Sequence, residues 1–320
     1  MNISQNAIVI CTERMFEWKS RLLVRSIRAF GGAHSSVRIF SYSPRPDHVP
    51  SRDCLDEFRE SGVQVVTESL NLAWPEYALA NKVVACAHAE RHCGLKKIAF
   101  IDSDQIVVSD FGLLFDTPAA FAARPVDLKN IGIANPGDEE GQYWDELYRT
   151  CSSKLERTVE TTVCRSQIRE YFDSGMFSVH GNARILGAWR RNFAAIWTAG
   201  LRPKAGDYFV EQSCLSATIS AVADEVLILP PGYNLPLESL YRQSVLSTGS
   251  SVPGRATVSL HYHRLFEDEP VDDVLAFAGM YLDRERSSWI RSNLNELCPV
   301  FSYRPVPATH LSLAGLPVRQ

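Results

Sequence analysis

Two aspartates one residue apart are the residues of this sequence that most directly suggest chemistry. Asp102 and Asp104 follow the apolar run 98–101, and a second apolar run, 106–108, begins almost at once. A buried carboxylate needs a partner of opposite charge or a metal ion, because leaving water is otherwise too costly. Carboxylate oxygens suit Mg²⁺ and Mn²⁺, which also bind phosphate oxygens and water. The pattern therefore predicts a Mn²⁺ or Mg²⁺ cofactor at the end of a buried strand.

The same triplet has a simpler interpretation as a turn. Asp and Ser are common in turns because their side chains bond to the nearby backbone. The apolar flanks on both sides favour the buried strand end, but the triplet alone does not decide between the two.

The segments around the triplet alternate between strand and helix patterns. Strands are expected at 7–11, 37–43, 62–68 and 96–102, and helices at 17–32 and 77–94. Such alternation predicts right-handed βαβ units and a parallel sheet. Ligands of these sheets bind beyond the carboxyl ends of the strands. We therefore expect residues 11–13 and 102–104 to line one crevice.

Later segments are less regular, and the pattern changes near residue 265. Further strands are expected at 119–125, 175–180, 226–236 and 256–263, and further helices at 183–200 and 207–222. We predict one main domain over 1–265, made of two halves, 1–115 and 116–265. Residues 266–320 are predicted to form a helical and then irregular C-terminal extension.

The composition excludes several classes of protein. The chain has 320 residues, of which 45% are hydrophobic and 22% charged, as in ordinary soluble proteins. A net charge of −4 gives no basic footprint for nucleic acid. The apolar run 7–11 is too short for a signal peptide or a membrane span. Eight cysteines without a CxxC pair suggest buried thiols. We therefore expect a cytoplasmic protein without a transmembrane segment.

An ordered set of segments resembles a known family. The segment "GLKKIAFIDSDQIV" looks like the DxD segment of the GT-A nucleotide-sugar glycosyltransferases, especially glycosyltransferase family 8. "FDSGMFSVH", "EQSCLSA" and "LPPGYNL" are similar to later segments of that family and come in the same order. "LHYHRL" falls where the family has a metal-binding histidine. The resemblance covers roughly residues 5–265. It implies a catalytic domain over 1–265, with a nucleotide-binding half (1–115) and a sugar and acceptor half (116–265).

The resemblance implies a fold and a reaction. The fold would be α/β and GT-A-like, with a mixed, mostly parallel sheet flanked by helices. The reaction would be metal-dependent transfer of a hexose or related sugar from a nucleoside-diphosphate sugar, with UDP-sugar as the expected donor. The acceptor could be a sugar, a lipid-linked glycan or a protein. Two departures concern the acceptor and the stereochemistry: Asp173 replaces the usual Asn, and the late HxxGxxKPW motif is absent.

The resemblance also implies site residues. Asp102, Asp104 and His261 would bind the metal ion, Thr12 the nucleoside, and Lys82 the diphosphate or ribose. Glu211 and Gln212 would act on the sugar hydroxyls near the anomeric carbon as the catalytic pair. The remaining expected donor-binding residues are Ser103, Asp173 and Gly175.

Each of these residues also has a structural interpretation. Thr12 could simply end a strand, and Lys82 alone resembles a solvated helix lysine. His261 could be a core histidine with satisfied hydrogen bonds. Strand alternation would place His261 and His263 on one face. Of the two, His261 lies nearer the apolar run and is the expected ligand.

Two other functions fit parts of the pattern. A haloacid-dehalogenase-like phosphatase would use Asp102 as nucleophile and Asp104 as acid. Its motif normally ends the first strand of the domain, whereas three strands precede it here. Ile106 also stands where Thr or Val is usual. A non-catalytic sugar-nucleotide-binding protein is the other alternative.

A pair of histidines also resembles part of a zinc site. His88 and His92 lie one helical turn apart, but they lack the second ligand pair that a zinc site needs.

Overall fold

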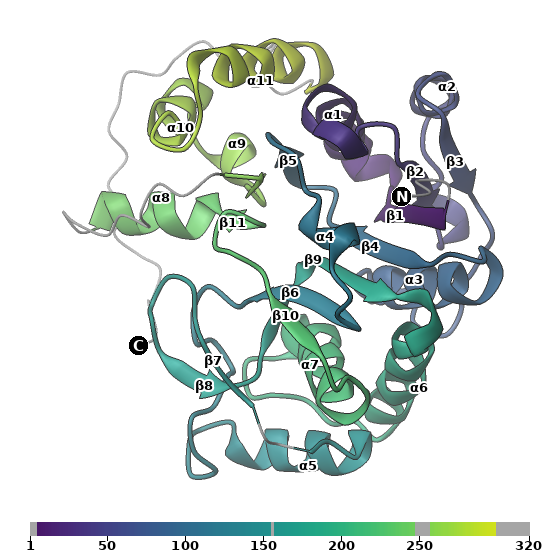
Figure 1. The fold of residues 1–320 in the computed structure, drawn as a ribbon, viewed down its shortest axis with the longest axis vertical. Helices are drawn as coiled ribbons and strands as arrows, with labels where there is room; N and C mark the ends of the chain where they lie inside the picture. The colour runs from purple at the N-terminus through teal and green to yellow at the C-terminus, as the bar shows by residue number, and fades with distance from the viewer. Residues whose placement is uncertain (1–4, 155–156, 247–256, 299–320) are drawn as a thin grey trace.

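The main sheet is mixed and mostly parallel. The computed structural model describes residues 5–154, 157–246 and 257–298. In this part of the chain, seven strands form one sheet in the order β10-β6-β9-β4-β1-β2-β3 (Figure 1). Only β9 runs antiparallel to its neighbours, β4 and β6. The strands are β1 (Asn6–Cys11), β2 (Arg38–Tyr42), β3 (Val63–Val66), β4 (Lys97–Ile101), β6 (Phe121–Pro125), β9 (Phe172–His180) and β10 (Val226–Ile228). The predicted fold class is confirmed.

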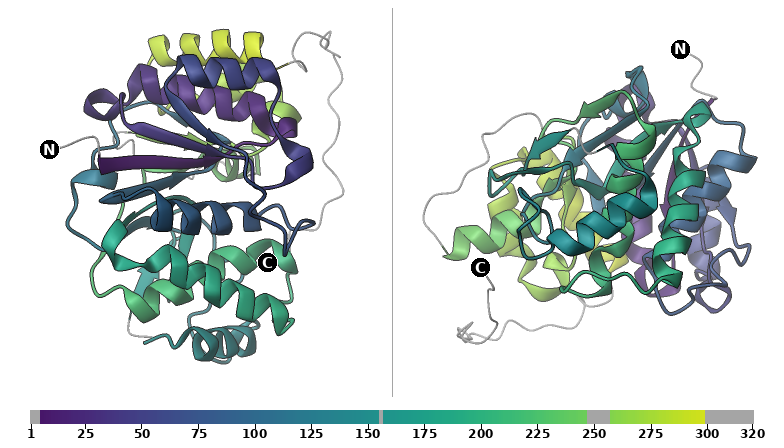
Figure 2. Two further views of the ribbon diagram at one scale, coloured as in Figure 1. Left: turned by 90° about the vertical axis from the view of Figure 1, so that its right-hand side faces the viewer. Right: turned by 90° about the horizontal axis from the view of Figure 1, so that it is seen from below.

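Helices cover both faces of this sheet. Figure 2 shows one layer of helices on each side of the strands. Helices α1 (Glu17–Phe30) and α2 (Arg52–Glu60) lie on one face, and α3 (Ala80–His92) and α7 (Val210–Val222) on the other. Helix α6 (Ile185–Thr198) packs on α3 and α7, and α5 (Gly141–Cys151) packs on α6 and α7.

Strand β1 shows why the sequence is continuously apolar there. Ala7 and Val9 belong to the buried cluster on the α3 side, whereas Ile8 and Ile10 belong to the cluster on the α1 side. The sequence of a strand that is buried on both faces is an uninterrupted run of apolar residues. This burial accounts for the strand pattern that the sequence predicts at 7–11.

A small second sheet brings late residues beside the aspartate pair. Strands β11 (Leu235–Pro236), β12 (Ser259–His261) and β5 (Gln105–Val107) form it in that order. Strand β12 pairs antiparallel with β5, so that His261 lies opposite Gln105. A two-stranded antiparallel hairpin, β7 (Thr158–Glu160) with β8 (Gln167–Arg169), lies elsewhere.

Three of the predicted strands differ from the observed ones in ways that affect the site or the topology. Strand β9 begins at Phe172, so Asp173 lies within the strand rather than in a loop before it. The predicted strand 226–236 is divided into β10 and β11, because Pro230 and Pro231 interrupt it. Of the predicted strand 256–263, residue 256 lies outside the described residues, and β12 ends at His261.

The C-terminal helices pack on the first half of the chain. Helices α8 (Leu237–Leu246), α9 (Leu265–Asp268), α10 (Val271–Ala278) and α11 (Arg284–Leu297) follow the main sheet, and α4 (Leu113–Asp116) precedes β6. Leu22 of α1 shares a buried cluster with Ile290 and Leu294 of α11 (Figure 1). Arg25 of α1 also donates to Asn293 Oδ1 at 3.0 Å. The irregular tail predicted at the C-terminus falls largely in 299–320, outside the described residues.

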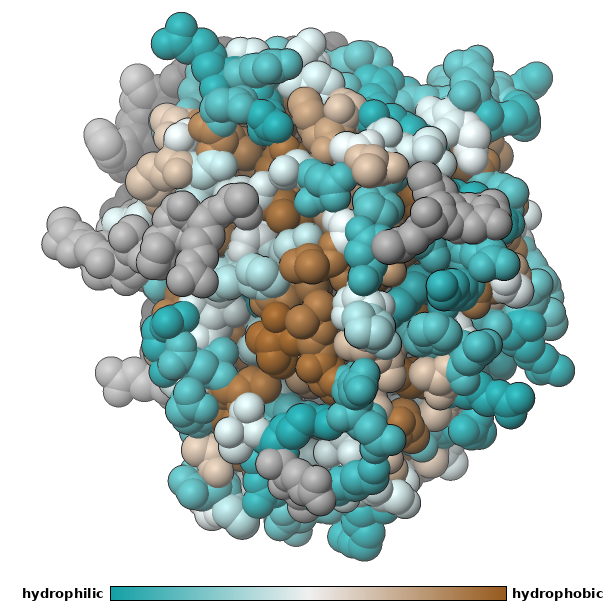
Figure 3. Space-filling model, in the orientation of Figure 1, coloured by the Kyte–Doolittle hydropathy of each residue, from teal (hydrophilic) through white to brown (hydrophobic). Residues whose placement is uncertain are grey.

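The surface has an apolar area over β10, near the middle of the face seen in Figure 1 (Figure 3). Ile228 of this edge strand is 47% exposed. None of the helices in the described ranges has the length and apolarity needed to cross a membrane. Cys54, Cys86 and Cys214 are buried thiols, as the cysteine pattern suggested.

The aromatic packing beneath the central strands gives a stability prediction. Phe177 is fully buried, and its ring lies 5.5 Å from that of Phe100 and 5.9 Å from those of Phe121 and Trp189. We expect Phe177→Ala to lower the free energy of unfolding by about 3–5 kcal/mol, because a cavity remains where the ring was. Urea unfolding, with Met280→Ala at an exposed site as control, measures this. A loss no larger than in the control would contradict the packing.

Candidate active site

A pocket of about 630 Å³ lies at the carboxyl ends of β1 and β4. It joins the end of β4, the start of β9, the start of α7 and the segment after β12. Most of the sequence-predicted site residues line it. They are Lys82, Asp102, Ser103, Asp104, Asp173, Gly175, Glu211, Gln212 and His261.

Thr12 is the exception. It is fully buried and absent from the pocket lining, and its hydroxyl accepts a hydrogen bond from Ser41 Oγ at 2.8 Å. Its neighbours Cys11 and Glu13 line the pocket instead. The prediction chose the correct strand end, but alternate residues of an extended chain point to opposite sides.

Lys82 is a buried ammonium between two carboxylates. Its Nζ donates to Asp102 Oδ2 at 2.9 Å and lies 3.3 Å from Glu211 Oε1. It also donates to Ser174 Oγ at 3.3 Å. Burial would lower the pKa of Lys82, but Asp102 and Glu211 outweigh it and hold this pKa well above its ordinary value. The alternative of a solvated helix lysine is therefore wrong.

Glu211 is a buried carboxyl of the pocket whose pKa is raised. Its Oε1 accepts from Ser174 Oγ at 2.8 Å, while its Oε2 is buried and accepts no hydrogen bond within the described ranges. Burial raises the pKa of Glu211 to about 7, although Lys82 acts in the opposite direction. The neighbouring Gln212 accepts from the backbone N–H of Ser174 at 3.2 Å. An unused oxygen of this kind is suited to a hydroxyl donor of a ligand.

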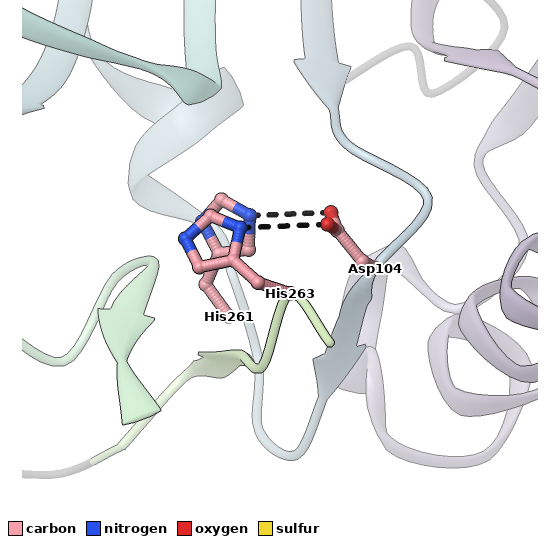
Figure 4. A group of neighbouring side chains, drawn as sticks. All are labelled: Asp104, His261 and His263. Atoms are coloured by element: carbon pink, nitrogen blue, oxygen red, sulfur yellow. Dashed lines mark hydrogen bonds and ion pairs between the residues drawn. The ribbon is translucent and has the colours of Figure 1, made fainter. Parts of the chain in front are cut away.

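Two histidines approach the same carboxylate. His261 Nε2 lies 3.1 Å from Asp104 Oδ1, and His263 Nδ1 lies 3.5 Å from Asp104 Oδ2 (Figure 4). Burial would raise the pKa of Asp104, but the two histidines hold it well below its usual range. Burial would lower the pKa of His263, but the hydrogen bond and the charge of Asp104 raise it to about 9.

The reason for this arrangement differs from the predicted one. His263 lies beyond the end of β12 and has a left-handed backbone, with φ of 47°. The imidazole centroids of His261 and His263 are 3.9 Å apart. A turn after the strand, rather than strand alternation, thus brings the two rings together.

The three side chains could hold a divalent ion. One ligand atom from each of Asp104, His261 and His263 lies within 4.8 Å of the others. Carboxylate and imidazole are common ligands of transition-metal ions. Asp102 is not in this trio, but its ion pair with Lys82 uses only Oδ2. Its Oδ1 therefore remains available to an ion in the pocket.

Gly175 is required by the position of His261. A Cβ at Gly175 would lie 2.8 Å from Cε1 of the His261 ring and 2.9 Å from Asp173 Oδ1. Cβ atoms almost never make contacts this short, so a side chain here would displace the ring. The sequence analysis expects Gly175 as a donor-binding residue, and the nearby histidine gives a structural reason for a glycine here.

Arg124 is a site residue that the sequence analysis missed. It is buried, and its Nη2 lies 3.2 Å from Asp173 Oδ2 while its Nη1 donates to Thr162 Oγ1 at 2.8 Å. It therefore holds Asp173, whose Oδ1 accepts from the N–H of Gly175 at 2.7 Å. A charged residue inside the apolar run 119–125 was the available signal.

Glu13 was also missed as an individual residue. It is buried and accepts from Arg45 Nε at 2.6 Å and from Asn81 Nδ2 at 2.7 Å. The aromatic side chains of Phe16 and Tyr208 line the pocket and are partly exposed. Flat rings at a pocket mouth suit a base or a sugar ring.

Comparison with known proteins identifies the family. A family profile described as Rhodobacterales glycosyltransferase domain matches residues 7–223, which is more than half of the chain. The chain belongs to this glycosyltransferase family. A comparison with curated protein sequences finds no match.

Solved structures agree with the fold. The glycosyltransferase GlyE of Streptococcus pneumoniae TIGR4 matches with a TM-score of 0.54 and 13% identity, over 92% of this chain. The present chain spans 64% of the length of GlyE. The galactosyltransferase LgtC, in complex with donor and acceptor sugar analogues, matches with a TM-score of 0.51 and 14% identity. That match covers 94% of this chain and 98% of LgtC.

These findings confirm the predicted resemblance to GT-A glycosyltransferases and the prediction that the protein is an enzyme. The phosphatase alternative is not favoured, because the family profile that matches more than half of the chain describes a glycosyltransferase domain. The non-catalytic alternative is not favoured either. At such low identity the structural matches establish the fold of this glycosyltransferase and not its substrates.

The protonation of Glu211 gives a pH prediction. The folded pKa of about 7 exceeds the ordinary value of 4.5, so between these values only the folded protein holds this proton. The group therefore reduces stability as pH rises from about 5 to 8. In the wild-type glycosyltransferase this loss of stability should be on the order of 2 kcal/mol. It should be absent in the Glu211→Gln variant.

Thermal and urea unfolding of both proteins across this pH range measure the difference. Glu60→Gln, at an exposed position, is the matched control. A constant offset between Glu211→Gln and wild type at every pH would mean that Glu211 is already ionised at pH 5.

The contact of Gly175 with His261 gives a prediction for metal binding. Gly175→Ala should leave the glycosyltransferase folded but reduce its affinity for Mn²⁺ roughly 10-fold or more, because the His261 ring is displaced. Gly137→Ala is the control, since a Cβ there meets no atom within 4 Å. Equal Mn²⁺ affinities of the two variants, measured by calorimetry, would show that His261 is not a ligand.

Proposed function

We propose that the enzyme transfers a sugar from a nucleoside-diphosphate sugar, with UDP-sugar as the first donor to test, to an acceptor. The observation that carries this proposal is the single pocket that combines a cation-binding cluster, a buried lysine and a buried carboxyl–amide pair. The cation-binding cluster suits the diphosphate of such a donor, and the lysine suits its negative charge. The carboxyl–amide pair suits the sugar hydroxyls.

The metal ion would be held by Asp102, Asp104 and His261. The ligand types support this assignment, since carboxylate oxygens and a neutral imidazole bind divalent ions that also bind phosphate oxygens. Such an ion, when bound, neutralises the negative charge that develops on the departing nucleoside diphosphate. Ser103, between the two aspartates, would lie beside the diphosphate.

Lys82 would supply a second positive charge at the diphosphate. Its high pKa, held up by Asp102 and Glu211, keeps it protonated at neutral pH. A cation already positioned in a buried site needs little rearrangement when charge develops nearby. Lys82 therefore supports donor binding without itself exchanging a proton.

Glu211 and Gln212 would hold the transferred sugar near its anomeric carbon. Glu211 Oε2 has no hydrogen-bond donor within the described ranges, and a sugar hydroxyl would satisfy it. Asp173, fixed by Arg124, and Gly175 would lie on the same side of the sugar. Fixing the sugar ring in this way favours reaction by orientation.

Thr12 would contribute to the nucleoside site only indirectly. Its backbone N–H donates to Tyr42 O at 2.8 Å and so joins the ends of β1 and β2. The side chains of Cys11 and Glu13, which line the pocket, are better placed to meet the nucleoside. We also propose a cytoplasmic location, which the buried thiols support. The acceptor would be a sugar, a lipid-linked glycan or a protein.

A screen of nucleotide sugars with Mn²⁺ tests the donor class. Hydrolysis of the donor and thermal stabilisation of the protein are measured in parallel. We expect UDP-sugars to stabilise the wild-type protein and to be hydrolysed slowly. If no nucleotide sugar stabilises the protein, the proposal is contradicted. Formation of a covalent phosphate on Asp102 would support the alternative of a phosphatase.

The aspartate pair gives the matching mutational prediction. Asp102→Ala and Asp104→Ala should each abolish the Mn²⁺-dependent part of UDP binding, because each would remove a metal ligand, while the fold is retained. Calorimetric titration of UDP with and without Mn²⁺ measures this, with the exposed Asp273→Ala as control. Unchanged Mn²⁺-dependent affinity in both site variants would exclude these aspartates as ligands.

A further inference from the structure

His263 lies where it could bind the same ion as Asp104 and His261. It comes two residues after His261, beyond the end of β12, and both imidazoles face the carboxylate of Asp104 (Figure 4). One ligand atom from each of the three lies within 4.8 Å of the others. Three potential ligands gathered at one point of a pocket form a more complete cation site than one histidine with one aspartate.

The backbone of His263 is held in an unfavourable conformation. Its φ of 47° is left-handed, which costs free energy for a residue with a Cβ. The buried Lys19 donates from Nζ to the carbonyl of His263 at 2.7 Å and also pairs with Glu267 at 3.4 Å. Unfavourable backbone conformations that the surroundings maintain are concentrated at functional sites. This conformation brings the His263 ring to Asp104.

The charges around the two aspartates also favour an ion that lies close to Asp104 and the two histidines. Its Oδ2 is paired with the ammonium of Lys82 at 2.9 Å, so much of its negative charge is already balanced. The carboxylate of Asp104 has no lysine or arginine partner within the described ranges and faces the two imidazoles. An ion held by Asp104 together with Asp102 Oδ1 would therefore have the two imidazole nitrogens as its remaining protein ligands.

We propose that His263 is a metal ligand together with Asp104 and His261, and that the two imidazoles make the site select a first-row transition-metal ion over Mg²⁺. Imidazole nitrogen binds transition-metal ions well, whereas Mg²⁺ prefers oxygen ligands and retains its water. His261 alone would leave the choice between Mn²⁺ and Mg²⁺ weakly determined. The inference rests on the metal-dependent transfer proposed above and narrows the cofactor to one class.

Metal binding to the whole protein, without nucleotide, tests this inference. After treatment with a chelator, the protein is titrated with Mn²⁺ by electron paramagnetic resonance, and Mg²⁺ is added as competitor. We expect Mg²⁺ to bind at least roughly 10-fold more weakly than Mn²⁺. His263→Asn should lower the Mn²⁺ affinity roughly 10–100-fold and reduce the preference over Mg²⁺. Asn tolerates left-handed backbone and offers a hard oxygen in place of nitrogen.

The matched control is His92→Asn, at an exposed position outside the pocket lining. Pulsed measurement of nitrogen couplings in the Mn²⁺-bound wild-type protein provides a readout that needs no variant, and two imidazole nitrogens are expected. A single coordinated nitrogen, equal affinity for the two metals, or an unchanged preference in His263→Asn would overturn the inference. Absence of any Mn²⁺ binding to the wild-type protein would instead contradict the metal-dependent function itself.

Discussion

The balance of buried charge around Lys82 is the constraint on which the pocket depends. Two carboxylates from distant parts of the chain, Asp102 and Glu211, meet one ammonium where little water is available. Lys82 and Glu211 are both buried, and an unpaired buried charge is far more costly than a paired one. Strand β4, helix α3 and helix α7 must therefore meet at this point.

The antiparallel strand β9 has a special place in this arrangement. It lies between β4 and β6, so its first residues emerge beside the ends of β4 and β1 rather than at the opposite edge. Asp173, Ser174 and Gly175 thereby reach the aspartate pair, and the carbonyl of Gly175 accepts from the N–H of Asp102 at 2.7 Å. A purely parallel sheet would have placed the start of this strand away from the pocket.

The sequence predicts the sheet and the aspartate pair well, because both follow from local patterns of apolar residues. It predicts individual side chains less well where distant contacts decide their role. Lys82 alone resembles a surface lysine, and only its meeting with Asp102 and Glu211 makes it part of the pocket. The family resemblance implies Thr12 at this strand end, but which residues of β1 face the pocket cannot be assigned without the rest of the sheet. The conformation of His263 depends on Lys19, which is 244 positions away in the chain.

The long separation between Asp104 and its histidines also affects how the site is made. Asp104 and His261 are 157 positions apart, and a chain leaves the ribosome from its N-terminus onward. During synthesis the carboxylate is present long before either imidazole, and closing so large a loop is slow compared with forming neighbouring βα units. The nascent protein thus builds most of its sheet while the cation cluster is still incomplete. Capture of the proposed metal ion by that cluster would therefore be a late event of biosynthesis, after most of the sheet has formed.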